Sequence, residues 1–253
     1  MRQLLSRTAG LSREDKGLLC GLPIFVLTVL AGWVVWRLTA DLDSIEARLI
    51  TAGNITQMTW DHVQIVVVSS VLVVGLAVPL GTLLTRPALR FFSPPVMAVA
   101  NAGQAAPVIG VLVLLALIIG FGFGTAVLAL SLYAFLPVLA NTITGMRGVD
   151  QAVVEAARGM GMSSWQVLLR VELPMALPVI MTGVRTSLVL LVGAGAFATF
   201  IDAGGLGTLI QTGIIMFRYP ILVSGAIFVA LLALMVEWVG RILELFLKPK
   251  GLA

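Results

Sequence analysis

Six long stretches of almost uninterrupted apolar residues constrain the fold of this chain more than any other feature. They lie near residues 18–38, 63–84, 95–119, 125–146, 176–199 and 220–240. A helix needs about 20 apolar residues to cross a bilayer, and each stretch meets that length. An outer-membrane barrel would instead show short segments of alternating polarity. The sequence therefore predicts an all-α, polytopic integral membrane protein with about six transmembrane helices.

The charge content supports the same class. Only 11% of the 253 residues are charged, whereas a soluble domain carries about a quarter, so there are too few charges to cover a water-exposed surface. Cys20 is the single cysteine and His62 the single histidine. A disulfide framework and a cysteine metal site are therefore excluded, no other metal site is expected, and no paired carboxylates or nucleophile–base set suggests a catalytic residue.

The positions of lysine and arginine predict the orientation in the membrane. With a cytoplasmic N-terminus, 13 of the 16 basic residues lie inside and the C-terminus is also cytoplasmic. Outside remain Arg37, Arg48 and Arg218. The inner group is Arg2, Arg7, Arg13, Lys16, Arg86, Arg90, Arg147, Arg158, Arg170, Arg185, Arg241, Lys248 and Lys250. The basic balance follows from this topology, so no nucleic-acid partner is expected.

One membrane domain is predicted to account for nearly the whole chain. Residues 1–62 would hold a cytoplasmic tail, the first transmembrane helix and, at 41–62, a short amphipathic helix on the outer surface. Residues 63–247 would form the core, with a cytoplasmic loop at about 147–175, and residues 248–253 a cytoplasmic tail. The glycine-rich segment 201–213 is expected to border a cavity, because irregular backbone at membrane depth must be buried in protein or line one.

The cytoplasmic loop is patterned as two short helices. Asp150 can cap a first helix, "QAVVEAAR", and Gly159 and Gly161 would break it because glycine tolerates left-handed backbone angles. Ser163 and Gln166 have the spacing of a capping box at the start of a second helix.

In that second helix, Trp165, Leu168 and Leu169 would lie on one face, and Gln166 with Arg170 on the other. Pro174 would end the helix, since the residue before a proline avoids helical angles.

Two interpretations of this loop remain open from the residues alone. It can be a solvated connection between two membrane helices. It can also be a docking element for a cytoplasmic partner, because exposed alanines and glycines let another backbone approach closely and the neighbouring charges would provide orientation and specificity.

The spacing of residues in this loop resembles a known signature. Glu155-Ala156-Ala157, then Gly161, Val171 and Leu173-Pro174 are similar to the signature loop of binding-protein-dependent (MetI-like) ABC importer permeases. Val171 departs mildly from the isoleucine usual in that family. The similarity runs from about residue 58 to 247 and includes "NAGQAAPVIGVL" and "FIDAGGLGTLIQTGI". Within the family it is most like the osmoprotectant branch, which imports glycine betaine, choline or carnitine.

The resemblance implies a MetI-like permease fold in a bacterial or archaeal cytoplasmic (inner) membrane. The loop would seat in a groove on an ATP-hydrolysing subunit, with Trp165 packed beside the membrane helices. The residues implied in this coupling are Glu155, Ala156, Ala157, Arg158, Gly159, Gly161, Ser163, Trp165, Leu173 and Pro174.

The resemblance also implies that the chain is not itself an enzyme. It has no Gly-x-x-x-x-Gly-Lys-Ser/Thr phosphate loop, so no cofactor is expected here, and ATP and Mg would be bound by a partner pair of ATP-binding subunits. A second permease subunit, identical or homologous, and an extracytoplasmic substrate-binding protein would complete the importer.

Polar residues inside the apolar stretches are candidates for the translocation pathway, because unpaired polar groups facing lipid are costly. These candidates are Asn101, Gln104, Asn141, Thr144 and Asp202. Helix–helix hydrogen bonding is an equal alternative for the three amides, and helix capping for Asp202. The other hydroxyls are expected to bond to carbonyls of their own helices: Thr142, Thr182, Thr186 and Ser187.

Trp60, Asp61 and His62 would sit at the outer end of the second membrane helix, as an interfacial anchor beside a helix cap. A stand-alone carrier or channel is a competing function, but such proteins place ionisable residues at mid-membrane or contain inverted repeats, and neither is evident. A membrane-embedded enzyme is a third possibility, but the sequence contains no set of catalytic residues to support it. Within the importer class, a permease for methionine or another amino acid is the alternative.

Overall fold

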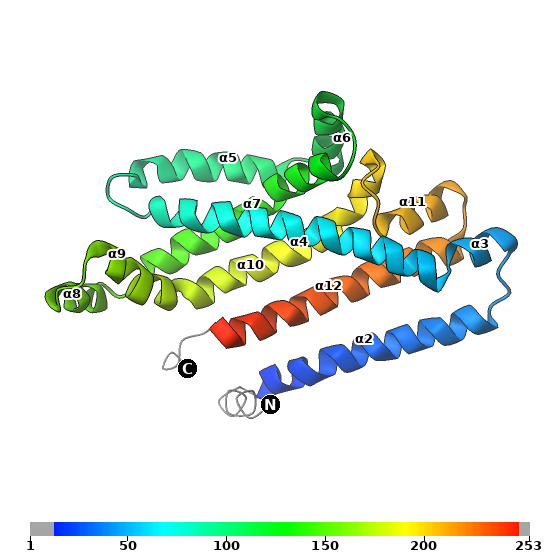
Figure 1. Cartoon of the computed structure of the whole chain (residues 1–253), viewed down its shortest axis with the longest axis horizontal. Helices are drawn as coiled ribbons and strands as arrows, with labels where there is room; N and C mark the ends of the chain where they lie inside the picture. Colours follow the sequence, from blue (N-terminus) through cyan, green and yellow to red (C-terminus); the bar gives the residue numbers. More distant parts are fainter. Residues whose placement is uncertain (1–12, 248–253) are drawn as a thin grey trace.

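The computed structural model describes residues 13–247 and consists of helices joined by short connections (Figure 1). Residues 1–12 and 248–253, which include the expected tails with Arg2, Arg7, Lys248 and Lys250, lie outside the described residues. In chain order the α-helices are α2 (Arg13–Thr39), α3 (Ser44–Leu49), α4 (Ala52–Leu83), α5 (Ser93–Ala105), α6 (Val108–Ile119), α7 (Phe123–Arg147), α8 (Gln151–Gly159), α9 (Ser164–Val167), α10 (Leu173–Gly195), α11 (Gly207–Ile215) and α12 (Tyr219–Leu247).

Five helical stretches are long and apolar enough to cross a membrane, and a sixth candidate is a bent pair. The five contain α2, α4, α7, α10 and α12. The sixth was expected as one stretch over 95–119, but the chain bends by 97° between α5 and α6. Pro107 explains the break: it has no N–H to donate to the preceding turn, and Ala106 before it takes the extended angles φ −66° and ψ 142°.

The second membrane helix begins earlier than expected. The amphipathic helix predicted over 41–62 is reduced to α3, and α4 already starts at Ala52. Thr51 caps α4 by accepting from Asn54 N at 3.2 Å, and the hydroxyls of Thr56 and Thr59 bond to carbonyls one turn back. These bonds satisfy the polar side chains locally, so the helix continues through them. The expected boundary between residues 62 and 63 therefore falls inside α4.

α7 lies at the centre of the bundle and packs against α4, α5, α6 and α10. Its contact with α10 is a backbone contact: a Cβ added to Gly183 would lie 2.5 Å from the Pro137 carbonyl oxygen. A larger residue would therefore push the two helices apart at this point. The main buried cluster surrounds this contact and includes Val73, Leu130, Leu139 and Leu191.

α2 lies at the edge of the bundle alongside α12 (Figure 1). The Trp33 ring meets Phe228 edge-to-face at 4.7 Å, and its Nε1 donates to Ser224 Oγ at 3.0 Å. Nearer the start of α2, Trp238 Nε1 donates to the Leu19 carbonyl at 2.8 Å. Two tryptophans thus fasten the first span to the last.

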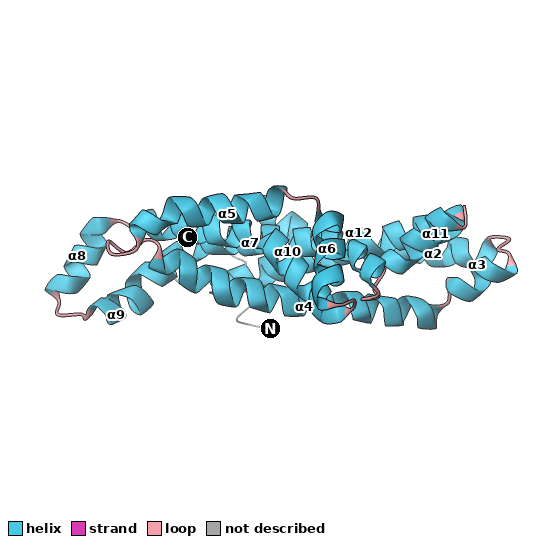
Figure 2. Ribbon diagram, turned by 90° about the horizontal axis from the view of Figure 1, so that it is seen from above, coloured by secondary structure: helices cyan, strands magenta, loops and turns pink. Residues whose placement is uncertain are grey.

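The molecule is elongated, with different elements at its two ends (Figure 2). α8 and α9 project beyond the bundle at one end, whereas α3 and α11 lie at the other. At the α3 end, Arg218 pairs with Asp43 and Glu46, which form a capping box at the start of α3.

Candidate functional site

The element α8–α9 is a helix, a glycine turn and a second helix, as the sequence predicts. Asp150 caps α8, its Oδ1 accepting from Ala152 N at 2.9 Å. Val154 and Ala157 face inward and join a cluster with residues of α7 and α10, among them Met146, Ala176 and Ile180. Glu155, Ala156 and Arg158 face outward and are exposed. One face of α8 therefore packs against the bundle, and the opposite face is exposed to solvent or to a partner.

The turn between the two helices has the predicted geometry at Gly161 but not at Gly159, which is the last residue of α8 and has no positive φ. Gly161 has φ +84°, in the left-handed region that favours glycine. Ser163 and Gln166 form the predicted capping box: Ser163 Oγ accepts from Gln166 N at 3.3 Å, and Ser163 N donates to Gln166 Oε1 at 2.8 Å. These bonds satisfy backbone donors at the start of α9 and give the turn one defined shape.

The predicted apolar face of the second helix is confirmed only for Leu168, which is half-buried against the cluster that holds Val154 and Ala157. Val167 is the buried residue, 1% exposed, whereas Trp165 is 66% exposed and does not pack beside the membrane helices. Leu169 is exposed as well. Residues 168–172 form a π-helical turn, so the side chains after α9 do not follow the 3.6-residue period assumed for that stretch.

Pro174 does not end the second helix. The chain continues from the π-helical turn into α10, and Pro174 lies in the first turn of α10. A proline is tolerated there because the preceding turn is π-helical, and such local adjustments satisfy the backbone groups that a proline would leave unpaired. α9, the π-helical turn and α10 thus form one continuous helical rod rather than two helices joined by a loop.

An ion pair that we did not predict from the sequence stabilises the junction between α9 and α10. Arg86, which follows α4, binds Glu172 in the π-helical turn: Nη1 donates to Oε1 at 3.2 Å and Nη2 to Oε2 at 2.5 Å. Glu172 is buried, and a bidentate arginine–carboxylate pair is the strongest form of this interaction. Glu172 was recognisable only as an acid next to an apolar stretch, which is a weak signal.

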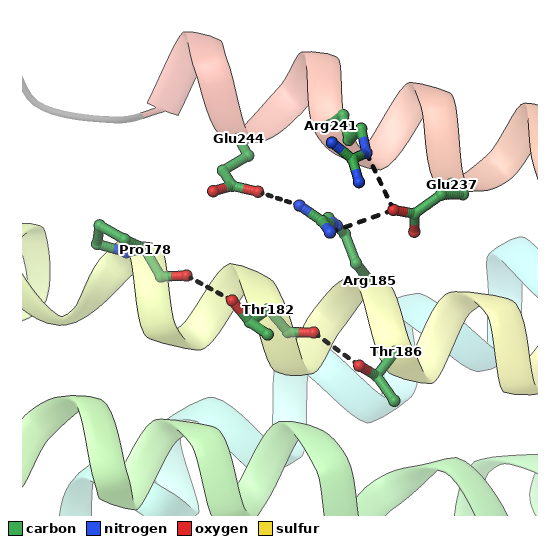
Figure 3. Close-up of polar contacts among 7 residues, drawn as sticks. All are labelled: Pro178, Thr182, Arg185, Thr186, Glu237, Arg241 and Glu244. Atoms are coloured by element: carbon green, nitrogen blue, oxygen red, sulfur yellow. Dashed lines mark hydrogen bonds and ion pairs between the residues drawn. The ribbon is translucent and has the colours of Figure 1, made fainter. Parts of the chain in front are cut away.

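A second charged group ties α10 to α12 (Figure 3). Arg185 lies within α10 rather than in the inner segment to which it was assigned. Its Nη1 binds Glu244 at 2.6 Å and its Nη2 binds Glu237 at 3.2 Å, while Arg241 Nε also binds Glu237 at 3.2 Å. The four charges sum to zero, so the group stays neutral inside an apolar helix pair.

The pathway candidates lie on α5, on α7 and at the end of the 3-10 segment Ala196–Ile201. Asn101 is exposed and Gln104 half-buried on α5, while Thr144 is exposed on α7. Asn141 donates to the Pro137 carbonyl of its own helix at 2.8 Å. Asp202 ends the 3-10 segment Ala196–Ile201 in a left-handed conformation with φ 63°, the capping position allowed as its alternative. No hydrogen bond between described residues joins any two of the five.

The hydroxyls behave as expected, with one exception. Thr142, Thr182 and Thr186 donate to carbonyls four residues back in their own helices, and Figure 3 shows the last two. Ser187 instead donates across to the Ala134 carbonyl of α7 at 2.9 Å.

His62 is not part of an interfacial anchor. Because α4 begins at Ala52, His62 lies well inside that helix and is fully buried. Leu206 N donates to Nδ1 at 3.3 Å, so the ring proton is on Nε2 and is donated to the Val192 carbonyl at 2.9 Å. The ring thus links α4 to α10 and to the glycine-rich segment.

Trp60, unlike His62, is exposed. In residues 13–247 no group of three or more His, Cys, Asp or Glu side chains could hold a metal ion.

The glycine-rich segment borders a groove, as predicted. The groove has a volume of about 530 Å³ and lies between α10, α11 and α12. Phe197 and Phe200 of the 3-10 segment, Gln211 of α11 and Val229 of α12 are among its lining residues. The two aromatic residues were not singled out from the sequence, because nothing local marks their rings as facing the same space.

The chain is similar to known membrane transport proteins. Residues 77–248 match the family described as "Binding-protein-dependent transport system inner membrane component". The carnitine transport permease protein OpuCB of Listeria monocytogenes is 40% identical over 200 residues, covering 79% of this chain and 90% of that protein. The glycine betaine/carnitine/choline transport system permease protein OpuCB of Bacillus subtilis is 36% identical over 200 residues, covering 79% and 91%.

A further relative and a solved structure extend the comparison. The osmoprotectant import permease protein OsmW of Salmonella typhimurium is 38% identical over 216 residues, covering 83% of this chain and 100% of that protein. The solved structure is a chain of the MetNI methionine ABC transporter in an inward-facing conformation. It has a TM-score of 0.68 and 23% identity over 82% of this chain and 100% of that one. This likeness concerns the fold alone.

Proposed function

The chain belongs to the family of binding-protein-dependent transport system inner membrane components, and we propose that it forms the pathway through which an ATP-driven importer carries small quaternary ammonium osmoprotectants. It is a multi-pass inner-membrane permease of the ABC importer class. The substrate class is that of two of the relatives above, named for carnitine in Listeria monocytogenes and for glycine betaine, carnitine and choline in Bacillus subtilis.

The observation that carries the coupling part of this proposal is the construction of α8–α9. The element projects from the bundle, is capped at both helix starts, and continues without a break into α10. A stiff element of this kind transmits a displacement of its tip to a membrane helix, whereas a flexible loop would absorb it. We therefore assign it to contact with a pair of ATP-binding subunits, which would bind ATP and Mg.

The proposed contact residues divide by exposure. Glu155, Ala156, Arg158 and Gly159 are exposed on α8 and would touch the partner directly. Trp165, exposed rather than packed on the bundle, is reassigned to this contact surface, since aromatic side chains are enriched at protein interfaces.

Other members of the expected set would act by shaping the element. Ala157 is buried against the bundle, Gly161 and Ser163 form the turn, and Leu173 and Pro174 begin α10. Asn101, Gln104, Asn141, Thr144 and Asp202 remain proposals for the pathway, which would lie between this chain and a second permease subunit.

We place α8–α9 on the cytoplasmic side. Arg147 ends α7 immediately before α8, and Arg158 and Arg170 lie within the projecting element or just after α9. Arg86 and Arg90 lie in the connection between α4 and α5, whereas among the described residues the α3 end holds only Arg37, Arg48 and Arg218. An excess of lysine and arginine is typical of cytoplasmic loops. An extracytoplasmic binding protein would then deliver substrate at the α3 end.

Reconstitution tests the proposal. Vesicles containing the permease, its ATPase subunits and its binding protein should accumulate radiolabelled glycine betaine, carnitine or choline when ATP is supplied on the ATPase side. Omitting the ATPase or the binding protein should abolish uptake. Uptake by the permease alone would identify a stand-alone carrier. ATP-dependent uptake of methionine, but of no betaine, would place the chain among amino-acid permeases.

A further inference from the structure

We propose that the groove between α10, α11 and α12 is a transient binding site for the substrate within the membrane. In this site Phe197 and Phe200 receive the trimethylammonium group and Gln211 receives the oxygen-bearing end. The inference rests on the proposed function for its substrate class. It goes further by assigning substrate recognition to the permease itself.

The aromatic pair is created by the local backbone. Residues 196–201 form a 3-10 segment, in which side chains three positions apart eclipse one another. Phe197 and Phe200 therefore face the same side, with ring centroids 6.3 Å apart and planes inclined by 36°. In an α-helix the same two residues would point 60° apart. Each of the two residues is 41% exposed and lines the groove.

The charge and size of the groove suit a methylated cation. None of the described residues that line the groove is charged. A quaternary ammonium has no N–H to donate and spreads its charge over methyl groups, so it binds aromatic faces and needs no carboxylate partner. Gly193, Ala226 and Ala230 keep the remaining wall open, and about 530 Å³ falls within the range of small-molecule sites.

The side-chain amide of Gln211 is oriented by a hydrogen bond to its oxygen, and its N–H donors remain available to a ligand. Thr199 Oγ1 donates to Gln211 Oε1 at 3.1 Å, and Thr199 lies 3.1 Å from the Thr208 hydroxyl. The amide oxygen is thus occupied by a hydroxyl chain, which leaves the two Nε2 protons for an acceptor in the groove. Gln211 is also the only polar side chain among the described lining residues. The carboxylate of a betaine, or the hydroxyl of choline, is such an acceptor.

Transport by single variants of the complete importer tests the aromatic pair. Phe197→Leu and Phe200→Leu should each lower glycine betaine uptake by about 3- to 30-fold, since one cation–π contact is worth that factor. Phe197→Tyr and Phe200→Tyr should retain uptake. Phe25→Leu is the matched control, because Phe25 is exposed on α2 and lines no part of the groove. ATP hydrolysis stimulated by the binding protein should persist in all five.

Gln211→Glu tests the other end of the substrate. A carboxylate in place of the amide would repel the carboxylate of glycine betaine but not the hydroxyl of choline. The ratio of choline to glycine betaine uptake should therefore rise by at least about tenfold, which corresponds to one unfavourable charge contact. An unchanged ratio would remove Gln211 from the site.

A binding measurement separates cation recognition from simple apolar burial. In the assembled Cys20→Ser importer carrying Ala230→Cys, choline should slow maleimide labelling of residue 230, whereas its uncharged analogue 3,3-dimethylbutan-1-ol should not. Equal protection by both compounds, or normal uptake by both leucine variants, would overturn the inference while leaving the proposed function intact. Absence of betaine uptake by the unmodified importer would instead refute the proposed function.

Discussion

Both terminal guanidinium nitrogens of Arg86 donate to the carboxylate of Glu172, at 3.2 and 2.5 Å, although the two residues lie 86 positions apart in the sequence. The pair joins the turn after α4 to the π-helical turn between α9 and α10. Any displacement of α8–α9 therefore acts on α4 as well as on α10. This is the structural basis for expecting both helices to respond to a cytoplasmic partner.

Glu172→Gln should uncouple the transporter, because it removes the charge and keeps the shape. We expect a loss of about 1–3 kcal/mol at this partly exposed pair and a several-fold fall in substrate carried per ATP hydrolysed. Arg86→Lys should have a smaller effect in the same direction, since lysine cannot bind both oxygens. The check is the ratio of uptake to ATP hydrolysis, and an unchanged ratio in Glu172→Gln would mean that the brace plays no part in coupling.

Gly161→Val should abolish transport while leaving the protein inserted in the membrane. No atom lies within 4 Å of an added Cβ, so the effect comes only from the positive φ of +84°, at a cost of about 1–3 kcal/mol for a side chain that avoids this region. Gly161→Asn is the control, because asparagine tolerates left-handed angles. Uptake by the two variants decides the point, and normal transport by Gly161→Val would show that the turn need not be rigid.

A cysteine at position 165 should report both the side of the membrane and the partner contact. In Cys20→Ser with Trp165→Cys, an impermeant maleimide should label inside-out vesicles from which the ATPase has been stripped. Adding the ATPase back should suppress labelling. Labelling from the extracytoplasmic side would reverse the proposed orientation, and labelling unaffected by the ATPase would place Trp165 outside the interface.

Arg185→Ala should destabilise the bundle, because Glu244 then loses its ion pair with Arg185 and Glu237 keeps the one with Arg241. We expect a loss of about 2–4 kcal/mol, read as a lower thermal midpoint in detergent. Adding Glu237→Gln and Glu244→Gln should recover much of that loss by removing the uncompensated charges. If the triple variant melted no higher than Arg185→Ala, packing by the arginine rather than charge balance would be its main contribution.

His62→Phe should release the glycine-rich segment. It keeps a ring but loses both hydrogen bonds, so Leu206 N–H loses its acceptor, at a cost of about 1–3 kcal/mol, and the Val192 carbonyl loses the imidazole donor. Hydrogen exchange at peptides containing Leu206 should speed up more than exchange in α2, which serves as the internal reference. Equal protection of this segment in both proteins would contradict the role assigned to His62.

Much of the local structure could be predicted from the sequence, because it depends on neighbouring residues. The apolar stretches indicated the membrane helices, and Asp150, Gly161 and the Ser163–Gln166 pair predicted the caps and turn of α8–α9. The family resemblance was also local, since it rests on spacing within one loop. The break at Pro107 was the exception: both apolar stretches around it read as one, and only the extended angles of Ala106 separate them.

The tertiary structure alone decided which distant residues meet. Leu206 reaches His62 across 144 positions and Arg185 reaches Glu244 across 59, and no periodicity encodes such pairings. It also decided that Val167 rather than Trp165 is buried, because α9 packs Val167 against the cluster that holds Val154 and Ala157. Phe197 and Phe200 share one groove because the 3-10 segment alters the turn per residue. Local sequence determines whether a helix forms and where it is capped, whereas the orientation of each side chain depends on the packing of helices far apart in the chain.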